Sequence, residues 1–315
     1  MTVYPRVPLK PETIKVVSDT LEIPAEEACL LENYRRFMNT MVNPKVDNSV
    51  HKETRVIKFN DVEVKIIIVR PLGREDEILP VILYLHGGGW VFTGYDIFSL
   101  ANRSDACLVF VDYSLSPEVK HPVALEECYA ALCWIQKNAD SIKVDSSRLA
   151  VTGDSAGGNL SAALTLLSKQ RGNTGISQQV LIYPVTDSNF ETFSYEEHKD
   201  DPFIHRDMMK YFWQSYIRDE NDYNLPLLAP LKSKLEDLKG LPPALVITAE
   251  TDVLRDEGEA YAKKLKKAEM PTVSVRYNNA SHGFFSLSTP SISAEGILAI
   301  QQTASWLKKE WNIES

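Results

Sequence analysis

The chain has 315 residues, 44% of them hydrophobic and 24% charged, which is typical of a globular protein and argues against a disordered or fibrous one. Its formal net charge of −9 disfavours binding to nucleic acid or to anionic membrane surfaces, because both repel it at long range. The sequence has no run of 18 apolar residues, and residues 1–10 lack the apolar stretch of a secretory signal, so stable membrane insertion is not expected. We therefore expect a cytoplasmic protein that acts on a small neutral molecule.

The cysteines also favour a reducing location. Cys29, Cys107, Cys128 and Cys133 show no C-x-x-C spacing, and three of the four lie in apolar periodic segments. We interpret them as reduced, buried thiols rather than as disulfide partners or metal ligands. Neither a metal nor another cofactor is expected.

The first elements expected are two helices, at residues 11–19 and 24–39. Two β-rich runs follow, at residues 54–59 and 62–69, and they flank an Asn-Asp pair that favours a tight turn. The sequence therefore predicts an antiparallel hairpin after the two helices.

Beyond residue 80, short and mostly continuous apolar runs alternate with helical stretches. This pattern is typical of strands that are buried on both faces of a parallel sheet. With the hairpin there are about eight strands, so the fold class expected is α/β, with a mostly parallel eight-stranded sheet flanked by helices. The later strands are expected at residues 81–85, 108–111, 149–152, 180–183, 244–248 and 272–277, and the main helices at 124–138, 156–170, 255–268 and 293–311.

One interval is too long for an ordinary connection in such a fold. It contains an acidic loop sequence at residues 195–201 and an amphipathic aromatic stretch at 207–217. We interpret this insertion and the first helices as a helical cap over the carboxyl ends of the strands, where open α/β sheets bind ligands. The organisation expected is N-terminal cap helices in residues 1–50, a core in residues 51–185 and 239–315, and a cap insertion in residues 186–238.

A G-x-S-x-G motif at residues 153–157 follows one expected strand and precedes one expected helix. In this context the motif indicates a nucleophile elbow, a strained turn that presents the serine hydroxyl. Gly153 and Gly157 leave room where side chains would collide with neighbouring backbone. Ser155 is therefore the candidate nucleophile, and the alternative is an ordinary glycine-rich entry to a helix.

A second motif, His-Gly-Gly-Gly-Trp at residues 86–90, follows another expected strand. In lipases and esterases an H-G-G-G loop in this place supplies backbone amides to an oxyanion hole. The candidate donors are the amides of Gly88, Gly89 and Ala156, with Gly87 as a weaker candidate. A flexible loop or a phosphate cradle is the alternative, and we interpret His86 as structural.

A serine hydroxyl needs a base, and the base needs a group that orients it. In α/β-hydrolases the order along the chain is serine, acid, histidine. His282 follows the last expected strand and is the candidate base. Asp252 is the candidate acid because it lies in the loop after the preceding strand. Its competitors are Glu250 beside it and Asp256 and Glu257, which fall where a helix begins and where acidic residues commonly stabilise the helix end.

Together these motifs resemble those of the hormone-sensitive-lipase-like esterases, whose members include arylacetamide deacetylases. The similarity spans roughly residues 80–311, because H-G-G-G-W, G-D-S-A-G-G-N-L, D-x-L-R-D-E-G and H-G-F occur in that order. The segment Y-S-L-S-P-E is similar to the Y-R-L-A-P-E of the family. Ser114 stands there in place of the usual arginine, and Val253 in place of the usual proline. The resemblance implies an α/β-hydrolase fold and a Ser-His-Asp triad.

Aromatic side chains are candidates for the wall of a substrate pocket, although most aromatic residues simply belong to a core. Trp90 and Phe285 are favoured because each adjoins a catalytic loop. The remaining candidates come from the expected cap or from the strand ends, and they are Phe203, Phe212, Trp213, Phe92 and Tyr183.

The expected function is a carboxylesterase that hydrolyses short to medium acyl esters through a covalent acyl-enzyme. The chain length is implied by the resemblance. Two alternatives remain open, an amidase or deacetylase acting on aryl amides and a non-catalytic ligand receptor on the same fold. The expected partner is a small-molecule ester, and a homodimer is left open.

Overall fold

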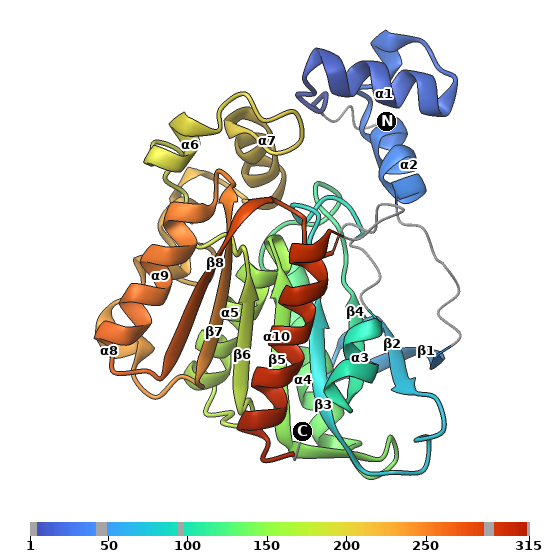
Figure 1. Cartoon of the computed structure of the whole chain (residues 1–315), viewed down its shortest axis with the longest axis vertical. Helices are drawn as coiled ribbons and strands as arrows, with labels where there is room; N and C mark the ends of the chain where they lie inside the picture. Colours follow the sequence, from blue (N-terminus) through green and yellow to red (C-terminus); the bar gives the residue numbers. More distant parts are fainter. Residues whose placement is uncertain (1–4, 42–48, 94–97, 287–292, 314–315) are drawn as a thin grey trace.

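A computed structural model describes residues 5–41, 49–93, 98–286 and 293–313. Its strands are β1 Val50–Phe59, β2 Val62–Pro71, β3 Leu79–Leu85, β4 Cys107–Asp112, β5 Val144–Asp154, β6 Gln178–Ile182, β7 Ala244–Thr251 and β8 Thr272–Ser281. They form one eight-stranded sheet in the order β1-β2-β4-β3-β5-β6-β7-β8 (Figure 1). The expected hairpin is present, since β1 pairs antiparallel with β2, which pairs antiparallel with β4. The other neighbours are parallel, so the predicted fold class is confirmed.

Helices cover both faces of the sheet. They are α1 Pro11–Leu21, α2 Leu31–Met41, α3 Ser99–Ser104, α4 Val123–Lys137, α5 Ala156–Gln170, α6 Phe193–Glu197, α7 Arg206–Tyr216, α8 Leu235–Leu238, α9 Arg255–Lys267 and α10 Ala294–Glu310. On one face α4 and α5 pack against Val81 and Leu83 of β3, and on the other α3 and α10 join the cluster that holds Ile82 and Tyr84. Side chains of a strand alternate between faces, so β3 is buried along its whole length. Within the described ranges, no helix is long and apolar enough to cross a membrane.

Two expected segments differ from the structure. Residues 24–39 do not form one helix, because a 3-10 turn at Ala25–Glu27 is followed by a break before α2 begins. In that break the carbonyl of Cys29 accepts the amide of Val7 at 2.9 Å and is not used by a helix. The expected acidic loop at 195–201 begins inside a short helix, α6. Its Ser194 hydroxyl donates to the carbonyl of Val253, a tertiary contact that the local sequence does not show.

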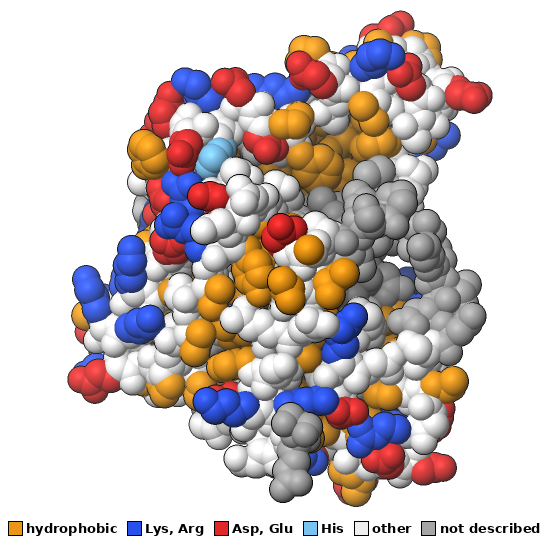
Figure 2. All heavy atoms as spheres, in the orientation of Figure 1, with side chains coloured by type: hydrophobic (Ala, Val, Ile, Leu, Met, Phe, Trp, Pro, Cys, Tyr) orange, Lys and Arg blue, Asp and Glu red, His pale blue; other side chains and the backbone are white. Residues whose placement is uncertain are grey.

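The helices α1, α2, α6 and α7 lie beyond the carboxyl ends of the parallel strands (Figure 1). Apolar side chains gather between the α7 region and the α1 and α2 region (Figure 2). The last part of residues 186–238 lies elsewhere, because α8 packs against α9. Lys169 at the end of α5 donates to two carbonyls of this part, those of Glu236 and Asp237, and to that of Lys239 just after it.

One arginine of helix α2 forms polar contacts with the core, in addition to the buried apolar side chains of the helix. Arg35 donates to the carbonyl of Val91 in the loop after β3 and to that of Ser116, both at 2.9 Å. It also forms a bidentate pair with Glu118, at 2.6 and 2.8 Å. These contacts hold the helix that carries Tyr34 and Met38 against the loop after β3.

We expect Arg35→Ala to loosen the N-terminal segment without unfolding the core. Hydrogen bonds from a charged group contribute about 1.5–3 kcal/mol, so a loss of about 2 kcal/mol raises the open population roughly 30-fold. Chymotrypsin cleavage after Tyr34 or Phe37 measures this opening. Arg36→Ala is the matched control, because Arg36 is exposed and its side chain donates to Asn33 at 3.2 Å. Equal cleavage of the two variants would contradict the anchoring role.

Candidate active site

Ser155 lies at the turn between β5 and α5. Its backbone has φ 55° and ψ −118°, a conformation that costs a non-glycine residue free energy and is found at functional sites. A Cβ on Gly157 would lie 1.9 Å from the carbonyl oxygen of Leu85, and one on Gly153 would lie 2.3 Å from that of Gly157. Glycine is therefore required at both positions for helix α5 to start against the end of β3.

Ser155, His282 and Asp252 lie in one hydrogen-bonded chain. The Nε2 atom of His282 is 2.9 Å from the Oγ of Ser155, and its Nδ1 is 2.7 Å from the Oδ2 of Asp252. The second oxygen of Asp252 accepts the amide of Leu254 at 2.9 Å, which fixes the carboxylate. With the proton on Nδ1, the ring donates to Asp252 and accepts from Ser155, as a general base requires.

The environment of His282 acts on its pKa in two directions. Burial of the ring lowers the pKa, but the Asp252 carboxylate and its hydrogen bond raise it, with smaller contributions from Asp154 and Asp201. The raising effects prevail, so the pKa of His282 lies above its ordinary value. An imidazolium formed during proton transfer is therefore stabilised where it forms.

The loop after β3 contains the candidate oxyanion donors. Gly88 and Gly89 have φ of 103° and 61°, which only glycine adopts readily. Along the described part of the chain, the amides of Gly88, Gly89 and Ala156 have no hydrogen-bond acceptor. The amide of Gly87 differs, because it donates to Asp154 at 2.9 Å. That hydrogen is already donated within the protein, so the expectation that Gly87 contributes to the oxyanion hole is not supported.

A narrow pocket with a cavity volume of about 40 Å³ adjoins Ser155 and His282. Of the expected pocket aromatics, Phe203 and Phe212 line it, as do Phe92 and Tyr183. Phe212 lies directly on the oxyanion loop, where a Cβ on Gly89 would come within 2.5 Å of its ring.

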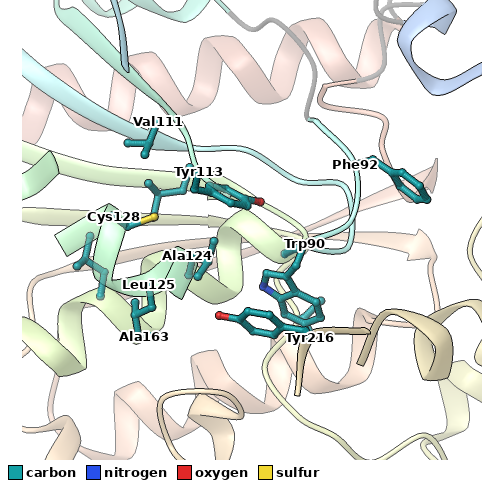
Figure 3. Packing of buried hydrophobic residues seen from close by; sticks show 14 of the residues in the cluster. Trp90, Phe92, Val111, Tyr113, Ala124, Leu125, Cys128, Ala163 and Tyr216 are labelled. Carbon is teal, nitrogen blue, oxygen red and sulfur yellow. The ribbon is translucent and has the colours of Figure 1, made fainter. Parts of the chain in front are cut away.

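Three expected pocket residues lie elsewhere. The ring of Trp90 stacks on that of Tyr216 with centroids 4.4 Å apart (Figure 3). It also packs edge-on against Trp213 with centroids 5.5 Å apart, and both indoles are fully buried. Phe92, two residues on, points away from this pair (Figure 3). Phe285 is buried among residues of the α10 face of the sheet. The expectation that Trp90, Trp213 and Phe285 line the pocket is wrong, because proximity in sequence did not show which way each side chain points.

Several further lining residues were not predicted from the sequence, among them four apolar or aromatic side chains. Tyr34 and Met38 come from α2, and Ile204 and Met208 come from the start of the α7 region. Tyr34 with Met38 and Met208 with Phe212 are each four positions apart, which places each pair on one face of its helix. That spacing was a usable signal, but it could not show that these faces meet over Ser155.

The other acidic residues near Asp252 face different partners. Asp256 accepts the amide of Ser194 at 2.8 Å, and Glu257 is buried and accepts the amide of Thr186 at 2.6 Å. Glu250 accepts the amide of Asn279 at 2.7 Å. The first two contacts join the segment after β6 to α9, and the third joins the ends of β7 and β8.

The departures from the family pattern leave the triad in place. Ser114 donates its amide and hydroxyl to the carboxylate of Glu127, both at 2.6 Å. Val253 is buried and its carbonyl accepts the Ser194 hydroxyl. All four cysteines are unpaired, and the described residues contain no group of three or more His, Cys, Asp or Glu side chains that could hold a metal ion.

Residues 82–286 match the alpha/beta hydrolase fold family, and the chain belongs to this family. It is 34% identical to carboxylesterase NlhH of Mycobacterium tuberculosis, over 92% of this chain and 94% of the relative. It is 28% identical to arylacetamide deacetylase of Bos taurus, over 83% of this chain and 80% of the relative. A solved esterase of Rhizomucor miehei has a TM-score of 0.85 and 40% identity, over 98% of both chains. The resemblance to hormone-sensitive-lipase-like esterases is therefore confirmed, and the chain is a hydrolase of this esterase family.

We expect Asp252→Asn and Asp256→Asn to separate catalysis from stability. Asp252→Asn leaves the imidazole without its anionic partner and should lower kcat by about 10⁴-fold, as in the same arrangement in a serine protease. Asp256→Asn weakens contacts to Ser194 and Arg255, so it should cost about 0.5–2 kcal/mol of stability and change kcat little. Ester turnover and thermal unfolding measure the two effects, and the reverse pattern would make Asp256 the acid.

Proposed function

We propose that this chain is a carboxylesterase that hydrolyses short to medium acyl esters through a Ser155-His282-Asp252 triad. The observation that supports it most directly is the continuous hydrogen-bonded chain from Asp252 through His282 to Ser155. A serine beside a base that a buried carboxylate orients is the arrangement that acyl transfer needs.

In the proposed reaction the Oγ of Ser155 attacks the ester carbonyl while Nε2 of His282 takes its proton. The amides of Gly88, Gly89 and Ala156 stabilise the oxyanion of the tetrahedral intermediate. His282 returns the proton to the alcohol as the carbon–oxygen bond breaks, which leaves an acyl group on Ser155. Water then attacks this acyl-enzyme through the same two steps in reverse, releasing the acid and restoring Ser155.

The pocket favours small and uncharged ester groups. Its described lining includes no lysine or arginine that could pair with an anionic substrate, and the walls are mainly aromatic and methionine side chains such as Phe92, Met208 and Phe212. Burial of an acyl chain gains about 0.8 kcal/mol for each methylene, but only while wall remains to receive it. The small free volume therefore favours short acyl groups.

An amidase or deacetylase acting on aryl amides is the second candidate. It is supported by the similarity to arylacetamide deacetylase and by the raised pKa of His282, because an amine leaves only when it is protonated. p-Nitrophenyl acetate and p-nitroacetanilide, compared under the same conditions, distinguish the two candidates. Binding of either compound without turnover would favour a receptor instead.

We also propose a cap formed by residues 1–50 and 186–238 on a core of 51–185 and 239–315, and a cytoplasmic location. The unpaired cysteines support that location.

A homodimer is proposed because β8, the last strand of the sheet, pairs with β7 alone among the described strands and exposes Val273. Sedimentation equilibrium would refute it by showing a monomer at micromolar concentration.

Ser155→Ala tests the proposed nucleophile. We expect it to remove essentially all ester turnover and all covalent labelling by a fluorophosphonate, because the proposed acyl-enzyme forms on the Oγ of Ser155. Alanine fits the site without a new contact, so the fold should persist, as circular dichroism would show. Labelling of the variant at near the wild-type rate would sink the proposal.

The dependence of rate on acyl length tests the pocket. With p-nitrophenyl esters from acetate to palmitate, kcat/KM should rise by up to about fourfold per methylene, reach a maximum between about two and eight carbons, and then fall. The enzyme should act on dissolved monomers. A maximum at palmitate, or a jump in rate above the solubility limit of the substrate, would instead indicate a lipase that works at an oil surface.

A further inference from the structure

One buried carboxylate, that of Asp154, lies at the meeting point of three loops of the site. It directly precedes Ser155 and is 3% exposed. Its Oδ1 accepts the hydroxyl of Tyr84 at 2.6 Å and the amide of Gly87 at 2.9 Å. Its Oδ2 accepts the hydroxyl of Ser286 at 2.9 Å. Tyr84 and Gly87 belong to β3 and the loop after it, and Ser286 follows β8, so the carboxylate joins these two segments to the nucleophile turn.

Each of these contacts fixes a part that the reaction uses. Gly87 begins the glycine loop, and a Cβ on it would lie 2.5 Å from Oδ2 of Asp154, so the loop backbone rests directly on this side chain. Ser286 follows His282 by four residues, and its hydroxyl is also 2.9 Å from that of Tyr183. The ring of Tyr183 lies 4.6 Å from that of His282. Asp154 thus connects the nucleophile turn to both the oxyanion loop and the histidine loop.

The charge of Asp154 also acts on the histidine. The groups that face His282 are the carboxylates of Asp252, Asp154 and Asp201 and the phenol of Tyr183, whose pKa burial raises well above its usual range. Asp154 is one of the carboxylates that raise the pKa of His282. Asp252 raises the pKa through its direct hydrogen bond to the ring. Of these three carboxylates, Asp154 is the one that also bonds to the loop after β3 and to the loop after β8.

The phenol of Tyr84 and the imidazole of His86 also lie near Asp154. Burial raises the pKa of Tyr84 well above its usual range and lowers that of His86, so both stay neutral near pH 7. Neither supplies a positive charge that would cancel the effect of Asp154.

We propose that Asp154 is a positioning residue that holds the oxyanion loop and the His282 loop in register with Ser155. Its negative charge acts on the imidazole of His282 in addition. The inference rests on the proposed hydrolase function. Asp154 forms no bond to the substrate in this scheme. It acts through Gly87, Ser286 and the electrostatic field at the imidazole.

Asp154→Asn separates charge from geometry. The amide oxygen can still accept from Tyr84 and Gly87, and the amide nitrogen can donate to Ser286, so the plateau of kcat/KM at high pH should fall by no more than about tenfold. Without the charge, the pKa of His282 falls and its free base persists to lower pH. The variant-to-wild-type ratio of kcat/KM should therefore rise as the pH is lowered. Tyr84→Phe is the control, because it removes one hydrogen bond but keeps the charge, so its ratio should not rise.

Asp154→Ala tests the positioning role. It removes every contact, and a displaced loop should lower kcat by about 100-fold with a smaller change in KM. If Asp154→Asn keeps most of the kcat that Asp154→Ala loses, the loss in the alanine variant comes from the missing contacts and not from the missing charge. If the alanine variant does not fold, Ser286→Ala breaks only the bridge to the histidine loop and should lower kcat about tenfold with no pH dependence of the ratio.

A pH-independent ratio for Asp154→Asn would overturn the electrostatic role, and an unchanged kcat for Asp154→Ala or Ser286→Ala would overturn the positioning role. Fluorophosphonate labelling of Ser155 in the wild type keeps these results apart from the proposed function. If the wild type neither labels nor turns over esters, the proposed function fails. If it does both and the Asp154 variants behave like it, only this inference fails.

Discussion

Close packing between the start of α5 and the end of β3 is the constraint on which the site depends. Gly157 lies against the carbonyls of Leu85 and His86, with no room for a methyl group. This contact brings the nucleophile turn beside the glycine loop, because the loop continues directly from those carbonyls. Ser155 is held in its strained conformation by backbone bonds on both sides, its amide donating to Ile182 and its carbonyl accepting from Val185. The free energy stored in one residue is offset by the buried sheet around it.

Much of the fold could be predicted because the sequence patterns that indicate strands and turns span only a few neighbouring residues. The apolar runs that predicted strands are continuous, since parallel strands are covered on both faces, and glycine motifs at strand ends have few alternative explanations. The side-chain pattern of β3 illustrates this, since all seven residues are buried. Strand order is not local and was not predicted, but the order of motifs along the chain indicated the triad. Catalytic candidates could therefore be placed at one edge of the sheet before any side chain was seen.

The pocket was harder to predict because its walls come from segments that are distant in sequence. Trp90 adjoins the oxyanion loop, yet its φ of 60° turns the indole toward Tyr216 and away from the substrate. Tyr34 lines the pocket from the N-terminal segment, where Arg35 binds the loop after β3 and the ring of Tyr34 packs edge-on against that of Phe92. An arginine that binds two carbonyls and one carboxylate leaves no pattern in sequence. Tertiary contacts of this kind decide pocket shape, and local propensity does not report them.

The charges around His282 favour its protonated, cationic form over its neutral form. Negative charge from Asp252, Asp154 and Asp201 stabilises the imidazolium that forms during each proton transfer. The same charge keeps the resting ring protonated up to a higher pH, and a protonated ring cannot act as the base. Burial of the ring opposes both the stabilisation of the imidazolium and this protonation. Asp201 lies in the proposed cap insertion and also accepts the amides of Phe203 and Ile204, which begin the pocket wall. One side chain of that segment therefore acts both on the electrostatics at His282 and on the shape of the pocket.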